Sequence, residues 1–148
     1  MEKIINDFTI NIATANGTGS QSANLILLNT LFRMGTNASG KNLFPSNIAG
    51  LPTWYIVRVS DHGYQAPGDN THIQVAMNID TWAEDINELL PNTVLIYNTD
   101  VKAPVERDDL ILYPIPMNSM ARKINPKLAK MVANMIYCLL YTSPSPRD

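Results

Sequence analysis

The chain has 148 residues, 45% of them apolar and 16% charged, which excludes a largely disordered protein and suits a single domain with its own core. The formal net charge of −2 argues against a nucleic-acid partner, because a phosphate backbone attracts basic proteins. The one cysteine, Cys138, excludes an internal disulfide and a cysteine-ligated zinc or iron–sulfur cluster within this chain. The sequence has no signal-peptide or membrane-span pattern, so we expect a cytoplasmic protein without a membrane partner.

The N-terminal part predicts a strand, a glycine loop and a helix. Residues 8–14 alternate apolar and polar side chains and are rich in β-branched residues, which favours a strand. Apolar residues then recur at helical spacing over residues 23–34, and Thr18 or Ser20 could cap this helix. Residues 36–52 are rich in turn formers, so we expect them to be irregular.

The remainder predicts four strands and two helices. The strands are expected at residues 53–60, 71–79, 93–98 and 109–116. Thr81 and Glu84 fit a capping box that would open a helix ending near Leu90, and Asn125 before a proline is a second helix start. The first two of these strands have no helical crossover between them. We therefore predict an α/β domain with a mixed β-sheet and flanking helices.

The glycine loop lies within "TANGTGSQSANLILL", residues 14–28. Gly17 and Gly19 match the first two glycines of a dinucleotide-binding fingerprint, but Ser22 occupies the third position and Lys41 stands where an acidic residue is needed. No Gly-Lys-Ser/Thr follows, so a Walker loop is also excluded. Two readings stay open: a turn that offers amides to an anion or polar ligand at a helix N-terminus, and a turn that only packs.

The other polar groups predict neither a catalytic residue nor a metal site. His62 and His72 are ten residues apart, which favours a polar turn and a hydrogen-bonded strand residue over paired metal ligands. Glu84, Asp85 and Glu88 are spaced as on the solvated face of a helix, rather than as an acid/base pair.

Residues 40–60, "GKNLFPSNIAGLPTWYIVRVS", combine loop chemistry with large apolar side chains. Five of them are expected to form an apolar patch that another domain or chain covers: Phe44, Pro45, Ile48, Leu51 and Trp54. A monomer seldom exposes such a group together, and a domain of this size has little need of so long an apolar loop for its own core.

The stretches "NGTGSQSAN", "FPSNIAGLPTWY", "VAMN" and "TWAEDI" resemble the gamma domain of 2-oxoacid:ferredoxin oxidoreductases. The resemblance covers Asp7 to Tyr137 and is most specific in "FPSNIAGLPTWY". It is closest to the form fused at the N-terminus of the alpha subunit of 2-oxoglutarate ferredoxin oxidoreductase. The fold that it implies resembles domain III of pyruvate-ferredoxin oxidoreductase.

The resemblance implies a part of an enzyme that oxidatively decarboxylates a 2-oxoacid, here 2-oxoglutarate, to an acyl-CoA with ferredoxin as acceptor. Thiamine diphosphate, Mg and the iron–sulfur cluster would be held by other parts, so the isolated chain is expected to be inactive. The partners would be the alpha domain of the same subunit and the beta subunit. This domain would be structural and would help to form the coenzyme A side of the site, with these candidate residues: Gly17, Gly19, Ser20, Gln21, Lys41 and Asn42.

We expect the gamma domain to occupy residues 1–137 and to be truncated within its C-terminal helix. Residues 138–148, "CLLYTSPSPRD", resemble a translated sequencing adapter and are expected to be a non-native tail. The rival interpretation is a stand-alone adaptor subunit of such a complex with no ligand contact. A nucleotide-binding α/β domain is a third and weaker alternative.

Overall fold

The computed structural model describes residues 7–43, 48–64, 66 and 70–142. The strands are β1 (Phe8–Ala15), β2 (Ala38–Leu43), β3 (Pro52–Val59), β4 (Ile73–Ala76), β5 (Val94–Asn98) and β6 (Ile111–Ile115). The α-helices are α1 (Ser20–Arg33), α2 (Trp82–Asn87), α3 (Met117–Ile124) and α4 (Ala129–Thr142). Two short 3-10 helices, η1 (Thr99–Val101) and η2 (Pro126–Leu128), precede β6 and α4 along the chain.

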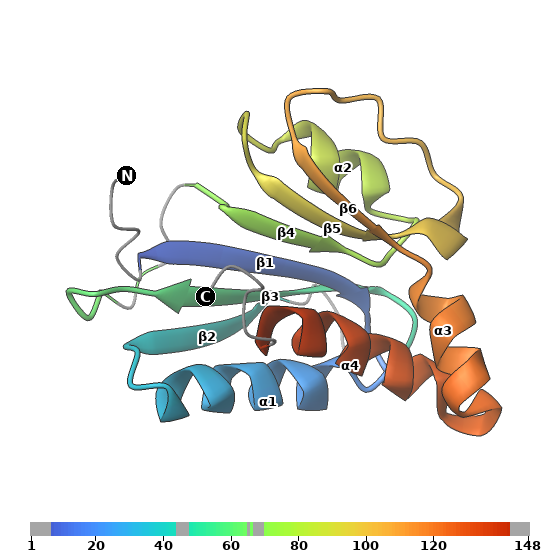
Figure 1. The fold of residues 1–148 in the computed structure, drawn as a ribbon, viewed down its shortest axis with the longest axis horizontal. Helices are drawn as coiled ribbons and strands as arrows, with labels where there is room; N and C mark the ends of the chain where they lie inside the picture. Colours follow the sequence, from blue (N-terminus) through green and yellow to red (C-terminus); the bar gives the residue numbers. More distant parts are fainter. Residues whose placement is uncertain (1–6, 44–47, 65, 67–69, 143–148) are drawn as a thin grey trace.

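The six strands form one mixed sheet in the order β2-β3-β1-β4-β5-β6, which Figure 1 shows from β2 at the bottom to β6 at the top. Neighbours from β1 through β4 and β5 to β6 are parallel, whereas β3 is antiparallel to both β1 and β2. The prediction of an α/β domain with a mixed sheet is therefore confirmed.

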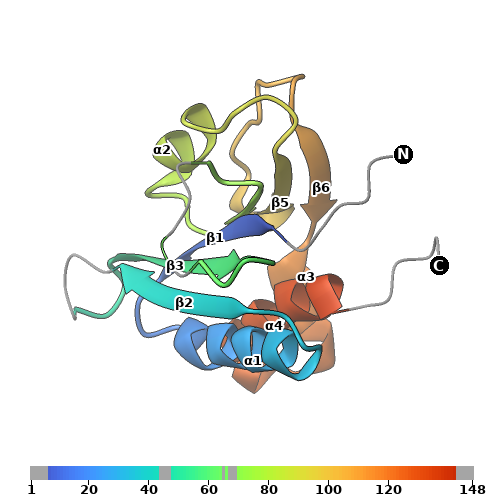
Figure 2. The same cartoon turned by 90° about the vertical axis from the view of Figure 1, so that its left-hand side faces the viewer.

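The helices divide between the two faces of the sheet. Figure 2 shows α1 and α4 side by side on one face and α2 on the other, and α3 packs against α4. The larger core cluster lies under α1 and α4, and it takes alternate β1 residues, Ile10 and Ile12, together with Leu27 of α1 and Ile136 of α4. The smaller cluster lies under α2 and is centred on Trp82 and Leu95. Alternation along β1 thus supplies one core face and leaves the opposite face polar.

The structure differs from the sequence-based expectation between residues 36 and 52, where β2 pairs with β3 over six residues. Its small polar residues have low strand propensity, so the pairing with β3 decides the conformation. Gly40 also has a packing reason, because a Cβ there would overlap the hydroxyl of Tyr55. Pairing with β3, which lies further along the chain, therefore overrides the preference of these residues for turns.

Helix boundaries differ as well. The sequence did not predict α3, which follows β6 directly at Pro116. Thr81 is the N-cap residue of α2 but makes no capping hydrogen bond, so the predicted capping box is wrong, and its hydroxyl instead donates to Asp85 Oδ2 at 2.5 Å. Asn125 does cap the segment before α4, accepting from the amides of Lys127 and Leu128.

Candidate functional site

The glycine loop joins β1 to α1 and needs both of its glycines. Gly17 and Gly19 have φ of +80° and +82°, a left-handed conformation that side chains with a Cβ disfavour. Gly17 also approaches the next loop closely, since a Cβ on it would lie 3.2 Å from the Cβ of Ala49. Gly19 is itself the N-cap of α1, and no side chain caps the helix, so the capping expected from Thr18 or Ser20 is wrong.

Hydrogen bonds hold the loop from both sides. The amide of Asn16 donates to Leu51 O at 2.8 Å, and the amide of Gly50 returns a bond of the same length to Asn16 O. Across 116 residues of sequence, Asn134 Nδ2 of α4 donates to Thr18 O at 2.8 Å. The loop is therefore fixed between the residues that precede β3 and the C-terminal helix.

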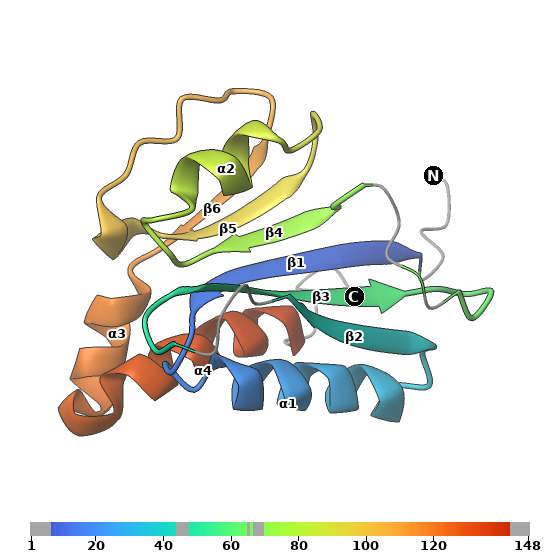
Figure 3. The same cartoon turned by 180° about the vertical axis from the view of Figure 1, so that it is seen from behind.

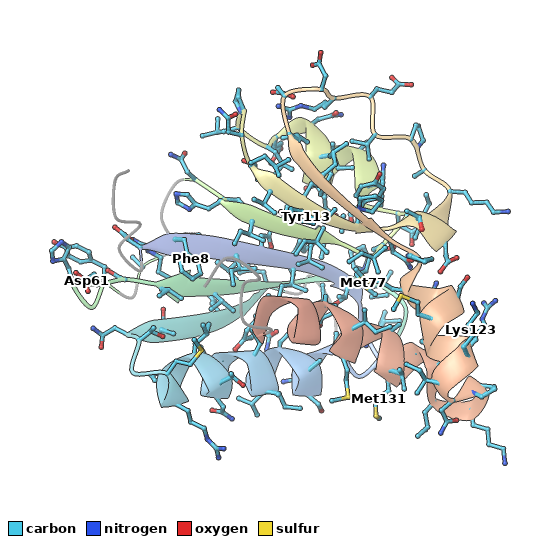
Figure 4. The ribbon with its side chains drawn as sticks, in the orientation of Figure 1. Phe8, Asp61, Met77, Tyr113, Lys123 and Met131 are labelled. Atoms are coloured by element: carbon cyan, nitrogen blue, oxygen red, sulfur yellow. The ribbon has the colours of Figure 1, made fainter. Side chains whose placement is uncertain are left out.

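The loop forms one wall of a groove of about 640 Å³. The opposite wall comes from α3, η2 and the start of α4, and it carries three basic residues, Arg122, Lys127 and Lys130. No acidic residue belongs to the described lining of this groove. Met131 of α4, labelled in Figure 4, lies beside Gly19, 3.8 Å from the position that a Cβ on this glycine would take. We call this hollow the basic groove.

The N-terminus of α3, and with it Arg122, is held by polar contacts to the end of β5 and to the short helix η1 that follows it. Asp100 accepts from the amide and the hydroxyl of Ser119 at 2.7 and 2.6 Å, and these bonds hold the pKa of Asp100 below its usual range, with the nearby Arg122 charge as a smaller cause. The buried Asn98 side chain accepts from the amide of Met117 at 3.1 Å. α3 is therefore fixed where it faces the loop.

The groove contains some of the residues predicted from the sequence and omits others. Gly17 and Gly19 line it, whereas Ser20 is buried in the first turn of α1 and Gln21 is exposed outside the described lining. Lys41 and Asn42 lie on the edge strand β2, paired with Ile56 and Tyr55, and neither lines the groove. The structure therefore brings a different set of cations to the glycine loop.

Sequence reasoning missed Arg122, Lys127 and Lys130 because they lie more than 100 residues beyond the loop. A local signal did exist. Arg122 stands four residues before Pro126, and the run "NPKLAK" combines two lysines with a helix start. Nothing in that run, however, indicates which loop it faces.

The predicted apolar patch is only partly described. Phe44 and Pro45 lie outside the described residues, while Ile48 is 65% exposed and Leu51 38% exposed. Trp54 is half-buried on β3, and its indole Nε1 donates to Asp85 Oδ1 at 2.7 Å. Asp85 is buried, so the prediction that it belongs to a solvated helix face is wrong.

Within the described part of the chain, no group of three or more His, Cys, Asp or Glu side chains is arranged to hold a metal ion. His72 lies immediately before β4 and accepts a hydrogen bond from the amide of Thr9 at 3.1 Å, so the prediction that it is a hydrogen-bonded residue is confirmed. Over the same residues, no helix combines the length and the apolar character needed to cross a membrane.

Solved structures similar to this chain agree on its fold. The 2-oxoglutarate:ferredoxin oxidoreductase from Magnetococcus marinus, solved with 2-oxoglutarate, coenzyme A and succinyl-CoA bound, matches with a TM-score of 0.77 and 26% identity, over 92% of this chain. Only 23% of that enzyme's chain is covered, so the present chain spans about a quarter of it.

Two further matches are separate subunits and support the fold alone. The gamma subunit of a keto/oxoacid ferredoxin oxidoreductase from Geobacter sulfurreducens matches with a TM-score of 0.67 and 18% identity, over 88% of this chain and 73% of that one. Subunit PORC of pyruvate oxidoreductase from Thermotoga maritima matches with a TM-score of 0.69 and 14% identity, over 95% and 80%.

No curated protein sequence matches the chain significantly. The family model described as pyruvate ferredoxin/flavodoxin oxidoreductase matches residues 9–141, which is nearly the whole chain. The resemblance found in the sequence, the mixed sheet and the family model agree, and the chain is thus a domain related to oxidoreductase subunits that belongs to the pyruvate ferredoxin/flavodoxin oxidoreductase family.

Proposed function

We propose that this chain is the gamma domain of a 2-oxoacid:ferredoxin oxidoreductase and that its basic groove binds the phosphate groups of coenzyme A. The observation that carries the proposal is the meeting of Arg122, Lys127 and Lys130 with the glycine loop, in a groove without a described carboxylate. Basic side chains and backbone amides near a helix N-terminus are the groups that bind phosphate in proteins. The related Magnetococcus marinus enzyme, which has coenzyme A bound, supports the same ligand.

The wider reaction would be the oxidative decarboxylation of 2-oxoglutarate to succinyl-CoA with ferredoxin as acceptor. The choice of 2-oxoglutarate follows the name and ligands of the Magnetococcus marinus enzyme. Thiamine diphosphate, Mg and the iron–sulfur cluster would be held by the alpha domain and the beta subunit, because this chain has one cysteine and no described metal-binding cluster. The chain by itself would turn over no 2-oxoacid.

Within that enzyme, the domain would act by binding and orientation. Asn134 fixes the glycine loop and Ser119 fixes α3 against Asp100, so the two walls of the groove are held before a ligand arrives. Such preorganisation strengthens binding because little conformational entropy is lost when the ligand enters. The exposed Ile48 and Leu51, with Phe44, Pro45 and Trp54, would pack against the alpha domain or the beta subunit.

The test uses the enzyme assembled from this domain and its remaining parts. Arg122→Gln and Lys130→Gln should each raise the KM for coenzyme A several-fold and leave the KM for 2-oxoglutarate unchanged, since each removes one charge from a solvent-accessible groove. Lys123→Gln is the matched control, because Lys123 follows Arg122 on α3 but lies outside the groove lining (Figure 4).

Equal KM values for coenzyme A in all three variants would refute the role of the groove and favour an adaptor domain without ligand contact. A KM for 2-oxoglutarate that rises in parallel would indicate a general defect of assembly instead. Binding of NAD(P) or ATP to the groove more tightly than coenzyme A would favour a nucleotide-binding domain.

A further inference from the structure

A second hollow, of about 390 Å³, lies on the face of the sheet opposite α1 and α4. In Figure 3, α2 lies beside β4 and β5, whereas β1 and β3 run past it with no helix in front of them. The floor of the hollow comes from neighbouring positions on three strands, because Asn11 of β1 is in register with Ile56 of β3 and with Gln74 of β4. We call this hollow the acceptor pocket.

Two amide oxygens in the acceptor pocket are buried without a partner. Gln74 is only 1% exposed, and its Nε2 points to Val75 O at 3.5 Å, which leaves Oε1 without a hydrogen bond within the described protein. Asn11 Oδ1 is also buried and has no hydrogen-bond partner among the described residues. Buried polar atoms in native proteins are normally satisfied by protein or by ordered water, so two neighbouring acceptors without a protein partner mark a place where a donor from outside this chain, either water or a ligand group, can bind.

Carboxylates line the wall that α2 contributes. Asp85 is buried and accepts from Trp54 Nε1 and Thr81 Oγ1, while the exposed Glu84 and Glu88 stand on either side of it in sequence. Burial raises the pKa of Asp85 above its usual range, and the two glutamates raise it further, against the lowering effect of its two hydrogen bonds. No basic side chain belongs to the described lining, so the pocket has an excess of acceptors and of negative charge.

The lining selects one kind of ligand. Metal ions need a cluster of close ligands, and the described side chains form none. A planar guanidinium, with several N–H donors on an aliphatic stem, matches two amide oxygens and a row of carboxylates above apolar walls formed by Leu43, Ile56 and Leu89. We propose that the acceptor pocket binds the guanidinium of an arginine side chain from an adjoining protein domain.

A protein source is favoured by the position of the pocket. Leu43 and Trp54 in its lining flank the loop whose exposed Ile48 and Leu51 form part of the interface proposed above. An arginine at the edge of that interface would be buried by the same contact, and buried arginines are frequent anchors of interfaces. The chemistry of the ligand stands on the pocket itself, and only the protein source rests on the proposed interface.

The first test separates charge from shape. The full chain is titrated with butylguanidinium and with butylurea, a neutral ligand of nearly the same shape, while the Trp54 indole N–H signal is followed by NMR. Saturable binding of butylguanidinium at millimolar concentration is expected, with butylurea weaker by roughly tenfold, because charge-assisted hydrogen bonds are stronger than neutral ones. No saturable shift, or equal binding of both ligands, would overturn the proposal.

Variants locate the site. Replacing both glutamates, Glu84→Gln with Glu88→Gln, should weaken butylguanidinium binding several-fold. The double variant Glu106→Gln with Asp108→Asn removes the same charge at exposed positions outside the pocket lining and should leave binding unchanged. Gln74→Met should weaken binding and lower the urea midpoint little, since in the free chain the orphan oxygen makes no bond and Nε2 makes only a long 3.5 Å contact to Val75 O. Unchanged binding in both the glutamate and the Gln74 variants would overturn the site.

The last arm tests the protein source. A capped glycine pentapeptide with arginine at its centre should bind the chain at least as tightly as butylguanidinium and should shift the same Trp54 signal. A chain that binds butylguanidinium but not this peptide would have a pocket for a free small cation, and the proposal of an arginine from a protein would be wrong. This outcome is independent of coenzyme A binding in the basic groove.

Discussion

Substituting Gly17 by alanine should destabilise the protein for two separable reasons. Its φ of +80° disfavours any residue with a Cβ by about 1–2 kcal/mol. The new Cβ would also lie 3.2 Å from the Cβ of Ala49, which is tighter than ordinary van der Waals contact. Gly35 provides a matched control, because its φ is +81° but nothing lies within 4 Å of the Cβ position.

The magnitude follows from this difference. Gly35→Ala should lose only the backbone term, about 1–2 kcal/mol. Gly17→Ala should lose that amount plus the strain of an overpacked contact, about 1 kcal/mol when the neighbouring loop can give slightly. At roughly 2–4 °C of melting temperature per kcal/mol for a chain of this size, the two variants should differ by a few degrees.

The assay is urea denaturation of the wild type, the two single variants, Ala49→Gly and the double variant Gly17→Ala with Ala49→Gly. The double variant should recover the excess loss of Gly17→Ala over Gly35→Ala, because the clashing methyl group is gone. The reasoning fails if Gly17→Ala is no more destabilising than Gly35→Ala. It also fails if Ala49→Gly recovers none of the excess, since strain then lies elsewhere.

Two further predictions concern buried polar side chains. Because burial raises the pKa of Asp85 above its ordinary value of about 3.9, the folded state holds this proton more tightly than the unfolded state. Its contribution therefore favours folding below that pH and is lost as the pH rises through the folded pKa. The urea midpoint of the wild type should accordingly fall relative to that of Asp85→Asn between about pH 4 and neutral pH. A midpoint difference between the two proteins that stays constant or rises over this range would contradict the prediction. Tyr137→Phe should lower the free energy of unfolding by about 1–3 kcal/mol, because the Tyr137 hydroxyl donates to the buried Asn24 Oδ1 at 2.8 Å. The control Tyr113→Phe, on the exposed edge strand, should change the urea midpoint little. Equal midpoints for the two variants would refute the importance of the buried bond.

The sequence by itself determined the elements whose signals are local. Period-two alternation in residues 8–14 predicted β1, and its two sides became the two faces of the sheet. The sequence also predicted that positions 17 and 19 require glycine, because a positive φ or a close approach of the backbone to a neighbour is the usual reason for a glycine pair in a strand-to-helix turn. The motifs between residues 16 and 86 carried enough specific pattern to indicate the family.

The composition of the basic groove could be predicted only in part. Its glycine wall was evident in the sequence, but its cations were assigned to the nearest downstream loop, at Lys41 and Asn42. The structure instead gathers Arg122 and Lys130 there, since Asn134 ties α4 to Thr18 across 116 residues. Proximity in sequence is a poor guide to such partners because helix packing, rather than chain distance, decides which surfaces meet.

Only the tertiary structure decided that residues 38–43 form a strand and that Asp85 is buried. Residues 38–43 have weak strand propensity and become a strand because β3 supplies their hydrogen-bond partners. Asp85 has the helical spacing of a solvated residue and is buried because Trp54, 31 residues away, offers an indole donor at 2.7 Å. In both cases a hydrogen bond formed across the fold outweighs the local preference, and such a bond has no counterpart in any short window of sequence.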